Sequence, residues 1–452
     1  MTRSFLWTGV RLAALCSLLL LAACGGKQIP PRDGIPSPHL GTIRDMRTFP
    51  QDLTVFAQQA GADTPLLDSQ AQAEQDARFN RIFFGPWDMR KTSIRKRDVE
   101  IYFRKAKGYK YGDVRWTQDE WDAMRANAGL KSFPNTAMYG ITVRNADLRE
   151  MPSHTPRFSE PTPDPRINPF DYFQYSLLPV GTPVFIAHTS RDGNWYYVET
   201  PVAAGWVDAN DIGIVEAFEA GYKTGSYVAV LRDNVPLPGS LAGQVNIGTV
   251  LPLAPSQSDN TRLAVLVPVK NGSRATVVTL TLAHEDAAIK PLPMTPAQVA
   301  LIGNVMMGQR YGWGGMFGDR DCSALTRELL TPFGIWLPRN SLSQARSGRR
   351  IMLDGMSIKE KEKAILRDGV PFLTLVWLRG HIMLYVGPYK GRPAIFHNVW
   401  GVRTVEGASD NERFVIGRAV VSSITPGSEL RNLYRTTTFG DRVNSITVLG
   451  GR

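Results

Sequence analysis

The residue best placed to do covalent chemistry in this chain is Cys322. It follows the glycine-rich stretch YGWGGMFGDRD and precedes apolar residues at positions 324, 325, 329 and 330, a spacing that suits one face of a helix. A cysteine at a helix N-terminus lies beside unpaired backbone N–H groups and the positive end of the helix dipole, and both favour the thiolate. Asp321 and Ser323 fit the N-cap and the first turn. The pattern indicates a nucleophile; a buried cysteine that packs as a small hydrophobe is the alternative.

A thiol nucleophile needs a base within hydrogen-bond reach and a group that orients the base. Two of the six histidines lie in apolar segments typical of consecutive strands, His381 in RGHIMLYVG and His397 in PAIFHNVWG, with the turn PYKGRP between them. If these strands pair as a hairpin, both imidazoles come near one edge of the site. The alternative for each histidine is a structural role in its strand.

The start of the chain has the features of a secretory leader. Residues 1–23 contain Arg3, Arg11 and the apolar run LAALCSLLLLAA, which is too short to span a membrane. The ending LAAC resembles the bacterial lipobox, which implies lipidation at Cys24; cleavage by an ordinary signal peptidase is the alternative. We therefore expect an exported protein of the cell envelope, lipid-anchored to the membrane and facing the periplasm if the cell is Gram-negative. Cys322 is then the single thiol of the mature chain that is not lipidated.

Length and composition indicate several folded domains. With 452 residues, 43% of them hydrophobic, we expect two to four. The formal charge of +11 favours polyanionic partners such as an acidic wall or anionic lipid, but we find no nucleic-acid motif and predict no nucleic-acid partner. The pattern divides into a leader (1–23), a Gly/Pro-rich tether (24–44), a helical region (45–126), two β regions (127–215 and 216–288) and a last region (289–452).

The regions ahead of the cysteine are expected to support it. In the helical region, Phe83, Phe84 and Trp87 are expected to anchor a helical arm. In the first β region, ADLREMP, GTPVFIAHTSRDGNWYYVET and AAGWVDANDI resemble a bacterial SH3 domain with a long inserted loop from Pro152 to Ser176. We interpret the second β region as a more divergent SH3-like barrel. After the linker KPLPMTP, Thr295 is expected to cap a helix that leads to the cysteine region.

The last region resembles the NlpC/P60 family of cell-wall cysteine peptidases. The resemblance lies in YGWGG, eleven residues ahead of the cysteine, in DCSALT and in LPRNSLSQ, and it extends from about Pro291 to the C-terminus. It implies a multidomain α+β protein, with a papain-like catalytic domain after two SH3-like barrels and a helical arm. It assigns Cys322 as nucleophile, His381 as base and later acid, and His397 as the residue that orients His381. By the same resemblance, Tyr311 joins the Cys322 N–H as an oxyanion donor.

The same resemblance implies a substrate. NlpC/P60 enzymes cleave peptidoglycan stem peptides, typically between γ-D-glutamate and the following diamino acid, so peptidoglycan or muropeptides are the expected partners. Asp321, Ser323 and Ser341 match positions that line the groove, and Arg339 is a candidate for the α-carboxylate of the glutamate. Asn340 stands where members that bind a free amine tend to have an acid. The candidates for a wall of the groove, and for holding an ammonium group, are in the loop NPFDYFQYS: Asp171, Tyr172 and Tyr175.

Two other functions are consistent with the sequence. One is a catalytically inactive protein that binds or organises the wall, and the other is acyl or thioester transfer on the same core. We expect no cofactor, because no Cys/His cluster has metal-ligand spacing. Alanine at position 324, where most family members have glycine, adds only a methyl group.

Overall fold

The computed structural model describes residues 40–162, 168–216, 218–254, 258–405 and 413–450. All of these residues belong to one compact unit. The expected leader, most of the tether and Cys24 lie outside the described residues. Within the described part, no helix is both long enough and apolar enough to cross a membrane.

The helical region is anchored by aromatic side chains, as its sequence predicts. The helix α3 begins after Asp68, whose side chain accepts a hydrogen bond from the Ala71 N–H, and the aromatic residues at its end join a buried cluster with residues of both β regions. Trp87 Nε1 donates to the Gly140 carbonyl at 2.8 Å. The helices are α1 (Asp45–Thr48), α2 (Leu53–Gln59), α3 (Ser69–Phe84), α4 (Lys96–Glu100) and α5 (Gln118–Ala128).

The first β region is a closely packed antiparallel sheet with a short apolar core. Alternate residues point inward, and the buried set includes Leu148, Val184 and Ile186. Its strands follow the spatial order β7-β1-β4-β5-β6-β2-β3. They are β1 (Met138–Thr142), β2 (Ala146–Arg149), β3 (Gln174–Leu178), β4 (Pro183–Thr189), β5 (Trp195–Glu199), β6 (Ala204–Asp208) and β7 (Ile212–Val215).

The second β region is joined to the first by strand pairing. Its long hairpin extends the first sheet to nine strands, because Arg274 pairs in parallel with Ile214 of β7. It also contains a three-stranded sheet of order β11-β8-β14, and its assignment as a second SH3-like barrel stays a prediction. Its elements are α6 (Glu219–Tyr222), β8 (Tyr227–Val230), β9 (Val235–Pro236), β10 (Gln244–Val245), β11 (Val250–Pro252), β12 (Arg262–Asn271), β13 (Arg274–Ala283) and β14 (Ala287–Lys290).

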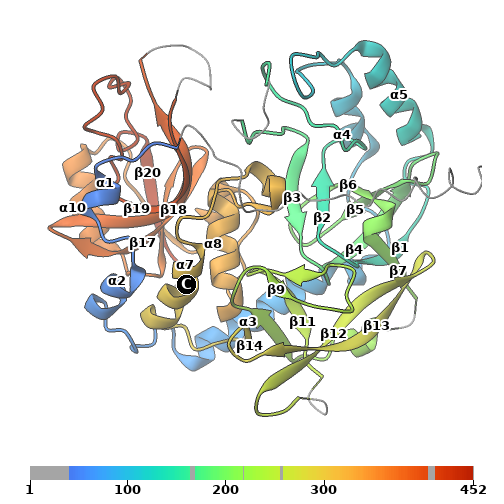
Figure 1. The fold of residues 1–452 in the computed structure, drawn as a ribbon, viewed down its shortest axis with the longest axis horizontal. Coiled ribbons are helices and arrows are strands. Elements are labelled where there is room, and N and C mark those ends of the chain that lie inside the picture. Colours follow the sequence, from blue (N-terminus) through green and yellow to red (C-terminus); the bar gives the residue numbers. More distant parts are fainter. Residues whose placement is uncertain (1–39, 163–167, 217, 255–257, 406–412, 451–452) are drawn as a thin grey trace, which may run out of the picture. The chain divides into compact units, whose positions relative to one another are not determined.

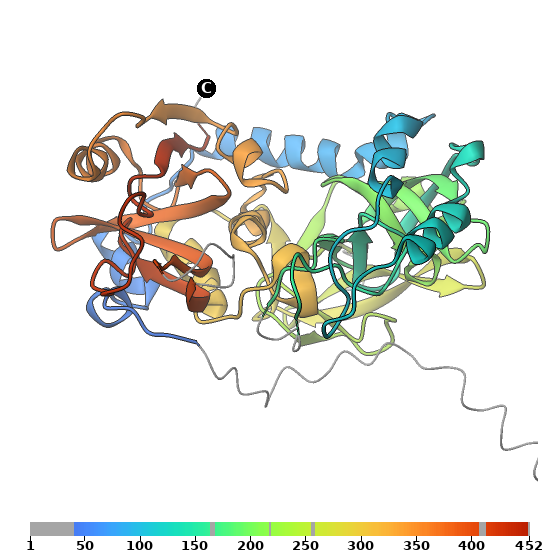
Figure 2. The same cartoon turned by 90° about the horizontal axis from the view of Figure 1, so that it is seen from above.

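The last region packs helices against a six-stranded antiparallel sheet of order β15-β20-β16-β17-β18-β19 (Figures 1 and 2). As predicted, Thr295 caps its first helix by accepting from the Gln298 N–H. The helix α8 packs against β17 and β18, and the N-terminal helix α2 packs against α7 and β17. The elements are α7 (Pro296–Met306), α8 (Cys322–Leu330), α9 (Ser341–Gln344), β15 (Arg349–Met352), α10 (Ile358–Asp368), β16 (Thr374–Leu378), β17 (His381–Tyr389), β18 (Arg392–Arg403), β19 (Arg413–Ser422) and β20 (Val443–Val448).

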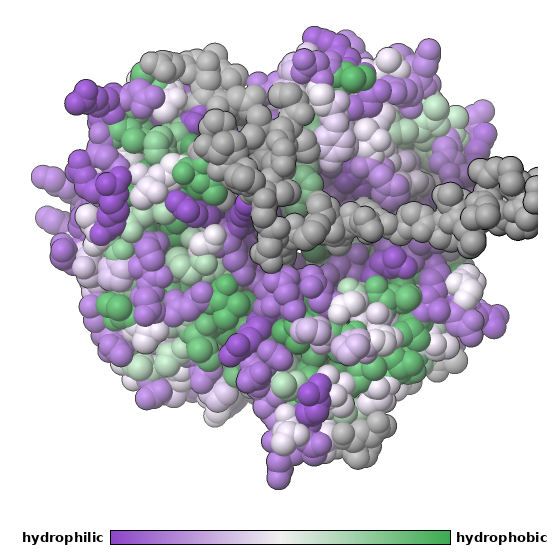
Figure 3. Space-filling view, in the orientation of Figure 1, coloured by the Kyte–Doolittle hydropathy of each residue, from purple (hydrophilic) through white to green (hydrophobic). Residues whose placement is uncertain are grey.

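Outside these cores, the visible face in Figure 3 is a mosaic of hydrophilic and hydrophobic residues. This mixture is ordinary for a protein surface, because polar side chains alone do not cover a folded chain. The mixed surface by itself therefore marks no functional site.

Candidate active site

Cys322 is the first residue of α8, as its sequence context predicts. Asp321 is the N-cap, and its Oδ1 accepts from the Ala324 N–H at 2.9 Å. The helix buries almost all of its side chains, because it lies between the sheet and the β regions. Cys322 itself is 6% exposed. The local sequence thus fixes the cysteine at a helix N-terminus, and the packing encloses it.

The two predicted histidines are brought together by the hairpin of β17 and β18. His381 Nε2 lies 2.8 Å from His397 Nδ1, and His397 Nε2 lies 3.0 Å from the Ser422 hydroxyl. That hydroxyl donates to the Ser423 carbonyl at 2.8 Å. We call this series of hydrogen bonds the histidine relay. It runs from His381 through His397 and Ser422 to the carbonyl of Ser423.

The relay determines the tautomer of both rings. Ser422 has one O–H, which is used toward Ser423, so its oxygen accepts and His397 Nε2 carries the proton. A neutral His397 then accepts at Nδ1, and His381 donates from Nε2. The remaining nitrogen, His381 Nδ1, is unprotonated. The arrangement therefore supplies a ring with a free lone pair, which is what a general base requires.

The sulfur lies at the start of β17, the strand that begins with His381. The backbone N–H of Ile382, the residue after His381, donates a hydrogen bond to the Cys322 thiol group. Cys322 is therefore close to the start of β17, although α9, β15, α10 and β16 separate it from His381 in sequence.

The resting pair is neutral, which differs from the expected thiolate. Burial raises the pKa of the Cys322 thiol to about 12, and the negative charge of Asp321 adds to the increase. Burial also lowers the pKa of the His381 imidazole to about 3, with a further contribution from the charge of Arg442. The expectation failed because desolvation outweighs the helix N-terminus at this degree of burial.

Tyr311 lies on the other side of the site. Its ring packs 5.9 Å from Phe170 and 6.1 Å from Trp400, measured between centroids. Burial, followed by the charges of Cys322 and Asp321, raises the pKa of the phenol well above its ordinary value. The phenol therefore keeps its proton and remains a donor, as a hydrogen-bonding role in the site requires.

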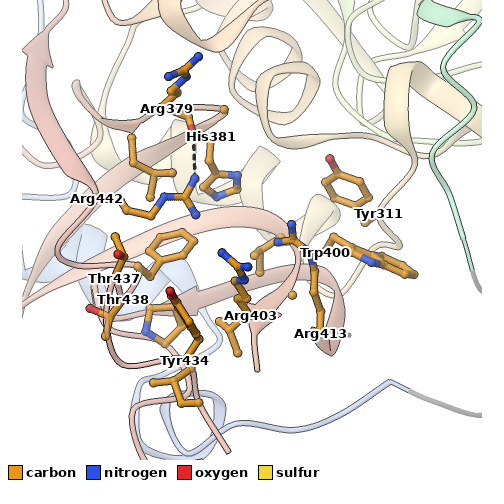
Figure 4. A pocket seen from close by; sticks show the side chains of 18 of the residues that line it. Tyr311, Arg379, His381, Trp400, Arg403, Arg413, Tyr434, Thr437, Thr438 and Arg442 are labelled. Atoms are coloured by element: carbon orange, nitrogen blue, oxygen red, sulfur yellow. Dashed lines mark hydrogen bonds between the residues drawn. The ribbon is translucent and has the colours of Figure 1, made fainter. Parts of the chain in front are cut away.

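A cavity of about 300 Å³ opens beside His381 and Tyr311. Figure 4 shows that both aromatic and arginine side chains surround it, with Arg413 beside Trp400 and Tyr434 on the side of Arg442. Phe170, Tyr172 and Trp313 also line it. The loop before β3 thus contributes a wall, as the sequence predicts, but chiefly through aromatic rings.

Behind the cysteine, Asp321 is fully engaged in hydrogen bonds. Oδ1 accepts from Ser323 Oγ at 3.0 Å and Arg339 Nη1 at 3.0 Å, besides the Ala324 N–H, and Oδ2 accepts from Gly314 N at 3.0 Å and Arg339 Nη2 at 2.6 Å. Burial alone would raise the pKa of this carboxyl, but the charge and hydrogen bonds of Arg339 outweigh it and the pKa is lowered. Asp321 is therefore a buried anion held by its neighbours.

A second buried ion pair lies one residue further back. Arg320 is bidentate to Asp233 at 2.7 Å for both bonds, and Nε lies 2.6 Å from Glu328 Oε2. Its other two bonds go to Gln309 Oε1 at 2.6 Å and the Ile247 carbonyl at 3.1 Å. All five N–H groups of the guanidinium are thus used. Asp233 and Ile247 belong to the second β region, so that region directly holds the chain segment leading into the cysteine.

The first β region holds the glycine-rich approach. Gly314 and Gly315 have φ of 64° and 89°, and a Cβ on either would lie 2.5 Å from Gln174 O or Leu177 Cβ of β3. Only glycine combines this backbone conformation with so close a contact. Ser176 of the same strand accepts from Arg339 Nε at 3.0 Å. Strand β3 and the approach to the cysteine are packed together without space for side chains.

Several predicted binding residues have other partners. Asp171 is 3% exposed and forms an ion pair with Arg149 at 2.9 Å, so the structure does not bring its carboxylate to the cavity. Tyr175 donates to Glu150 Oε2 at 3.2 Å, and Asn340 caps α9 by accepting from the Ser343 N–H. Of the three predicted loop residues, only Tyr172 lines the cavity.

The remaining predicted residues lie behind the cysteine. Arg339, expected to meet a substrate carboxylate, is committed to Asp321, and Ser323 bonds to both of them. Ser341 is the first residue of α9.

Other site residues were missed. Ser422 ends β19 and carries no local signal, and Arg379, Arg403 and Arg442 line the cavity from three separate segments. Only Arg379 has a neighbouring signal, because it lies two residues before His381. Among the described residues, no group of three or more His, Cys, Asp or Glu is arranged to hold a metal ion.

A cysteine on a helix, facing two histidines on adjacent strands of an antiparallel sheet, is the layout of a papain-like cysteine peptidase. Residues 308–418 match the NlpC/P60 family, residues 156–208 match the SH3 domain of the SH3b1 type, and residues 13–133 match the NlpC/P60 stabilising domain, N-terminal. The chain is therefore a multidomain protein with an NlpC/P60 domain and an SH3 domain.

A solved structure shares this architecture. An NlpC/P60 endopeptidase from Photobacterium damselae subsp. piscicida is 24% identical, with a TM-score of 0.78 over 91% of this chain and 98% of that one. A Bacillus cereus NlpC/P60 family protein is 16% identical, with a TM-score of 0.41 over 60% of this chain and 81% of that one. At this identity the first likeness shows the fold. No curated protein sequence matches the chain.

Proposed function

We propose that this protein is a cysteine endopeptidase that hydrolyses peptidoglycan stem peptides, at the bond between γ-D-glutamate and the following diamino acid. The observation that carries the proposal is the histidine relay, which leaves Nδ1 of His381 unprotonated at the start of β17, where the Ile382 N–H donates to the Cys322 sulfur. The NlpC/P60 match and the described endopeptidase of the same fold support this reaction class.

In the proposed reaction, His381 Nδ1 removes the thiol proton as Cys322 Sγ attacks the γ-carbonyl of the glutamate. The carbonyl oxygen becomes an oxyanion that the Cys322 N–H and the Tyr311 phenol stabilise. Collapse of the tetrahedral intermediate breaks the C–N bond, and His381 returns the proton to the leaving amine. Water, activated by the same imidazole, then hydrolyses the thioester and regenerates the thiol.

The neutral resting pair is compatible with this sequence of steps. With the thiol pKa raised to about 12 and the His381 pKa lowered to about 3, a thiolate–imidazolium pair is not the resting state. Proton transfer then accompanies attack rather than preceding it. His397 and Ser422 stabilise the imidazolium as it forms, because His381 Nε2–H already points at His397.

One observation favours the alternative of a catalytically inactive wall-binding protein. Cys322 is only 6% exposed and is not among the residues lining the cavity. If substrate does not reach the sulfur, the domain has no working nucleophile and acts as a scaffold.

Hydrolysis of defined peptides separates the two functions. The mature full-length protein is incubated with L-Ala-γ-D-Glu-diaminopimelate and with whole sacculi, and products are measured by mass spectrometry. We expect release of L-Ala-γ-D-Glu from the peptide by the wild type, and none by Cys322→Ala or His381→Ala. His284→Ala, at an exposed histidine of the second β region, is the matched control and should retain full activity. No release from either substrate would favour the scaffold.

We propose export and lipidation at Cys24 on the sequence alone. The expected result is that the wild type fractionates with membranes and Cys24→Ser does not. Equal membrane association of the two proteins would contradict the anchor.

A further inference from the structure

The segment of residues 41–51, which we call the N-terminal strap, covers part of the outer edge of the six-stranded sheet. It contains α1, which packs against β19, the last strand in the order of that sheet (Figure 1). The backbone groups on the outer side of such a strand need partners other than a strand. At the end of β19, the Gln51 side chain bonds to both backbone groups of Val421 at 2.9 Å. Val421 directly precedes Ser422, so the strap fixes the chain next to the histidine relay.

Asp45, the first residue of α1, bonds to the residue at which the histidine relay ends. Its Oδ2 accepts from the Ser423 N–H at 2.8 Å and from the Ser423 hydroxyl at 2.6 Å. The Thr425 N–H donates to the same hydroxyl at 3.0 Å, so the chain is held on both sides of the Ser423 carbonyl. Asp45 and Ser423 are both buried. A hydrogen bond lost between them is therefore not replaced by one to bulk solvent.

The Ser423 carbonyl decides which ring nitrogens of the relay carry the protons. It accepts the Ser422 O–H, so Ser422 presents a lone pair to His397, and the series leaves His381 Nδ1 unprotonated. If this carbonyl turned away, the Ser422 O–H would be free to donate to His397 Nε2. His397 would then donate from Nδ1 to His381 Nε2, and the proton of His381 would lie on Nδ1. A protonated Nδ1 has no lone pair with which to accept the thiol proton.

We propose that Asp45 is a positioning residue, which holds the Ser423 carbonyl so that the histidine relay keeps Nδ1 of His381 free of a proton. The inference rests on the proposed function for its effect on turnover, but its effect on the tautomers does not depend on any reaction. The N-terminal strap thus connects the helical region to the protonation of the general base, in addition to covering the edge of the sheet.

Turnover separates positioning from stability. Full-length Asp45→Ala and Asp45→Asn are assayed on L-Ala-γ-D-Glu-diaminopimelate, and each variant is also melted thermally. We expect Asp45→Ala to lower kcat about fivefold with KM little changed, which is part of the contribution of general acid–base catalysis. Asp45→Asn should keep most of the rate, because its amide oxygen accepts the same two hydrogen bonds. Equal losses in the two variants would overturn the proposal.

Asp52→Ala is the matched control. Asp52 caps α2, directly after the strap, by accepting from the Thr54 N–H at 2.9 Å. Removing this cap should lower the melting temperature and leave kcat unchanged. A fall in kcat as large as that of Asp45→Ala would show that any loosening of this region slows turnover, and it would overturn the specific role of Asp45.

Nitrogen NMR of isotopically labelled histidine rings tests the tautomers directly. In full-length Cys322→Ala, we expect His381 and His397 to be protonated at Nε2. Adding Asp45→Ala should shift both rings toward protonation at Nδ1. His188, whose Nε2 lies 2.7 Å from the Ala128 carbonyl, is an internal control and should not change.

A milder variant keeps this test valid if Asp45→Ala does not fold. Ser423→Ala removes the hydroxyl bond to Asp45 and keeps the N–H bond, and it should shift the tautomers in the same direction by a smaller amount. Unchanged tautomers in the folded variants would overturn the proposal.

The outcomes distinguish this role from the proposed function. If the wild type hydrolyses neither peptide nor sacculi but the tautomers depend on Asp45, the peptidase is wrong and the role of Asp45 in the relay stands. If Asp45→Ala hydrolyses the peptide at the wild-type rate with unchanged tautomers, the peptidase stands and the role of Asp45 is wrong.

Discussion

Both sides of Cys322 contain arginines, and these differ in whether they form ion pairs. Behind the cysteine, Arg320 is buried and Arg339 is partly buried, and each is paired with a carboxylate, at 2.7 and 2.6 Å. In front of it, Arg379, Arg403 and Arg442 line the cavity and form no ion pair with a described residue. Buried, paired charges hold a structure in place, whereas open, unpaired charges are available to a ligand. The comparison separates arginines that hold the chain around the nucleophile from arginines that border the cavity.

The largest effect on activity is expected for Cys322, which lies between the two sides. Cys322→Ala should reduce kcat by about four orders of magnitude or more, because it removes the nucleophile of a group that acts as a unit. Its melting temperature should stay near that of the wild type. Turnover within tenfold of the wild type would show that this sulfur is not the nucleophile. The comparison of its two sides would then have no bearing on catalysis.

Breaking the paired side should cost stability. Asp321→Asn leaves the partly buried Arg339 without its counter-charge, and we expect the free energy of unfolding in urea to fall by about 3–5 kcal/mol. Replacing both residues, as Asp321→Asn with Arg339→Met, should restore part of that loss. If the double variant were less stable than the sum of the single effects, the pair would not be the stabilising unit.

The neutral pair at the junction should make stability depend on pH. Below the ordinary histidine value of 6.5, the unfolded chain binds protons that native His381, with a pKa of about 3, does not. The contribution of neutral His381 to the free energy of unfolding is therefore fully present above pH 6.5. The free energy of unfolding then falls as the pH decreases toward 3, by up to about 1.4 kcal/mol per pH unit. Thermal melts between pH 7 and 4.5 measure it, and His381→Gln should show a shallower decline. Equal slopes would contradict burial of a neutral His381.

The histidine relay should have a moderate effect on rate. Ser422→Ala removes the acceptor of His397 Nε2, and we expect kcat to fall about tenfold with KM little changed, within the range for acid–base positioning. Ser422→Thr keeps the hydroxyl and should restore most of the rate. An alanine variant with a normal kcat would remove Ser422 from the relay.

The smallest effect on stability is expected on the open side. Arg403→Gln should change the free energy of unfolding by less than about 0.5 kcal/mol, because the side chain is exposed and forms no described ion pair. Urea unfolding beside Asp321→Asn measures the contrast. A loss as large as that of Asp321→Asn would mean that the two sides do not differ.

Sequence predicted the parts of the site that depend on local chemistry. Asp321 and Thr295 are N-caps as expected, because a cap needs only residues three positions away. The hairpin that joins the two histidines is likewise encoded by adjacent strands and a short turn.

Charge pairing and burial could not be predicted in this way. Arg339 was expected to face a ligand and Asp171 an ammonium group, but each meets an internal partner that only the tertiary fold supplies. The thiolate prediction failed for the same reason, since the helix N-terminus is a local feature and desolvation is not.

The bond between Arg320 and Asp233 limits how this catalytic region can be reused. A fragment that begins near Pro291 would keep the cysteine and both histidines but lose Asp233 and the Ile247 carbonyl. The guanidinium of Arg320, which is buried in the full chain, would then lose these partners and be exposed to solvent. Transplanting the peptidase onto another targeting module therefore requires carrying the second β region with it. The smallest part of the chain that keeps this site intact therefore includes the second β region as well as the last region.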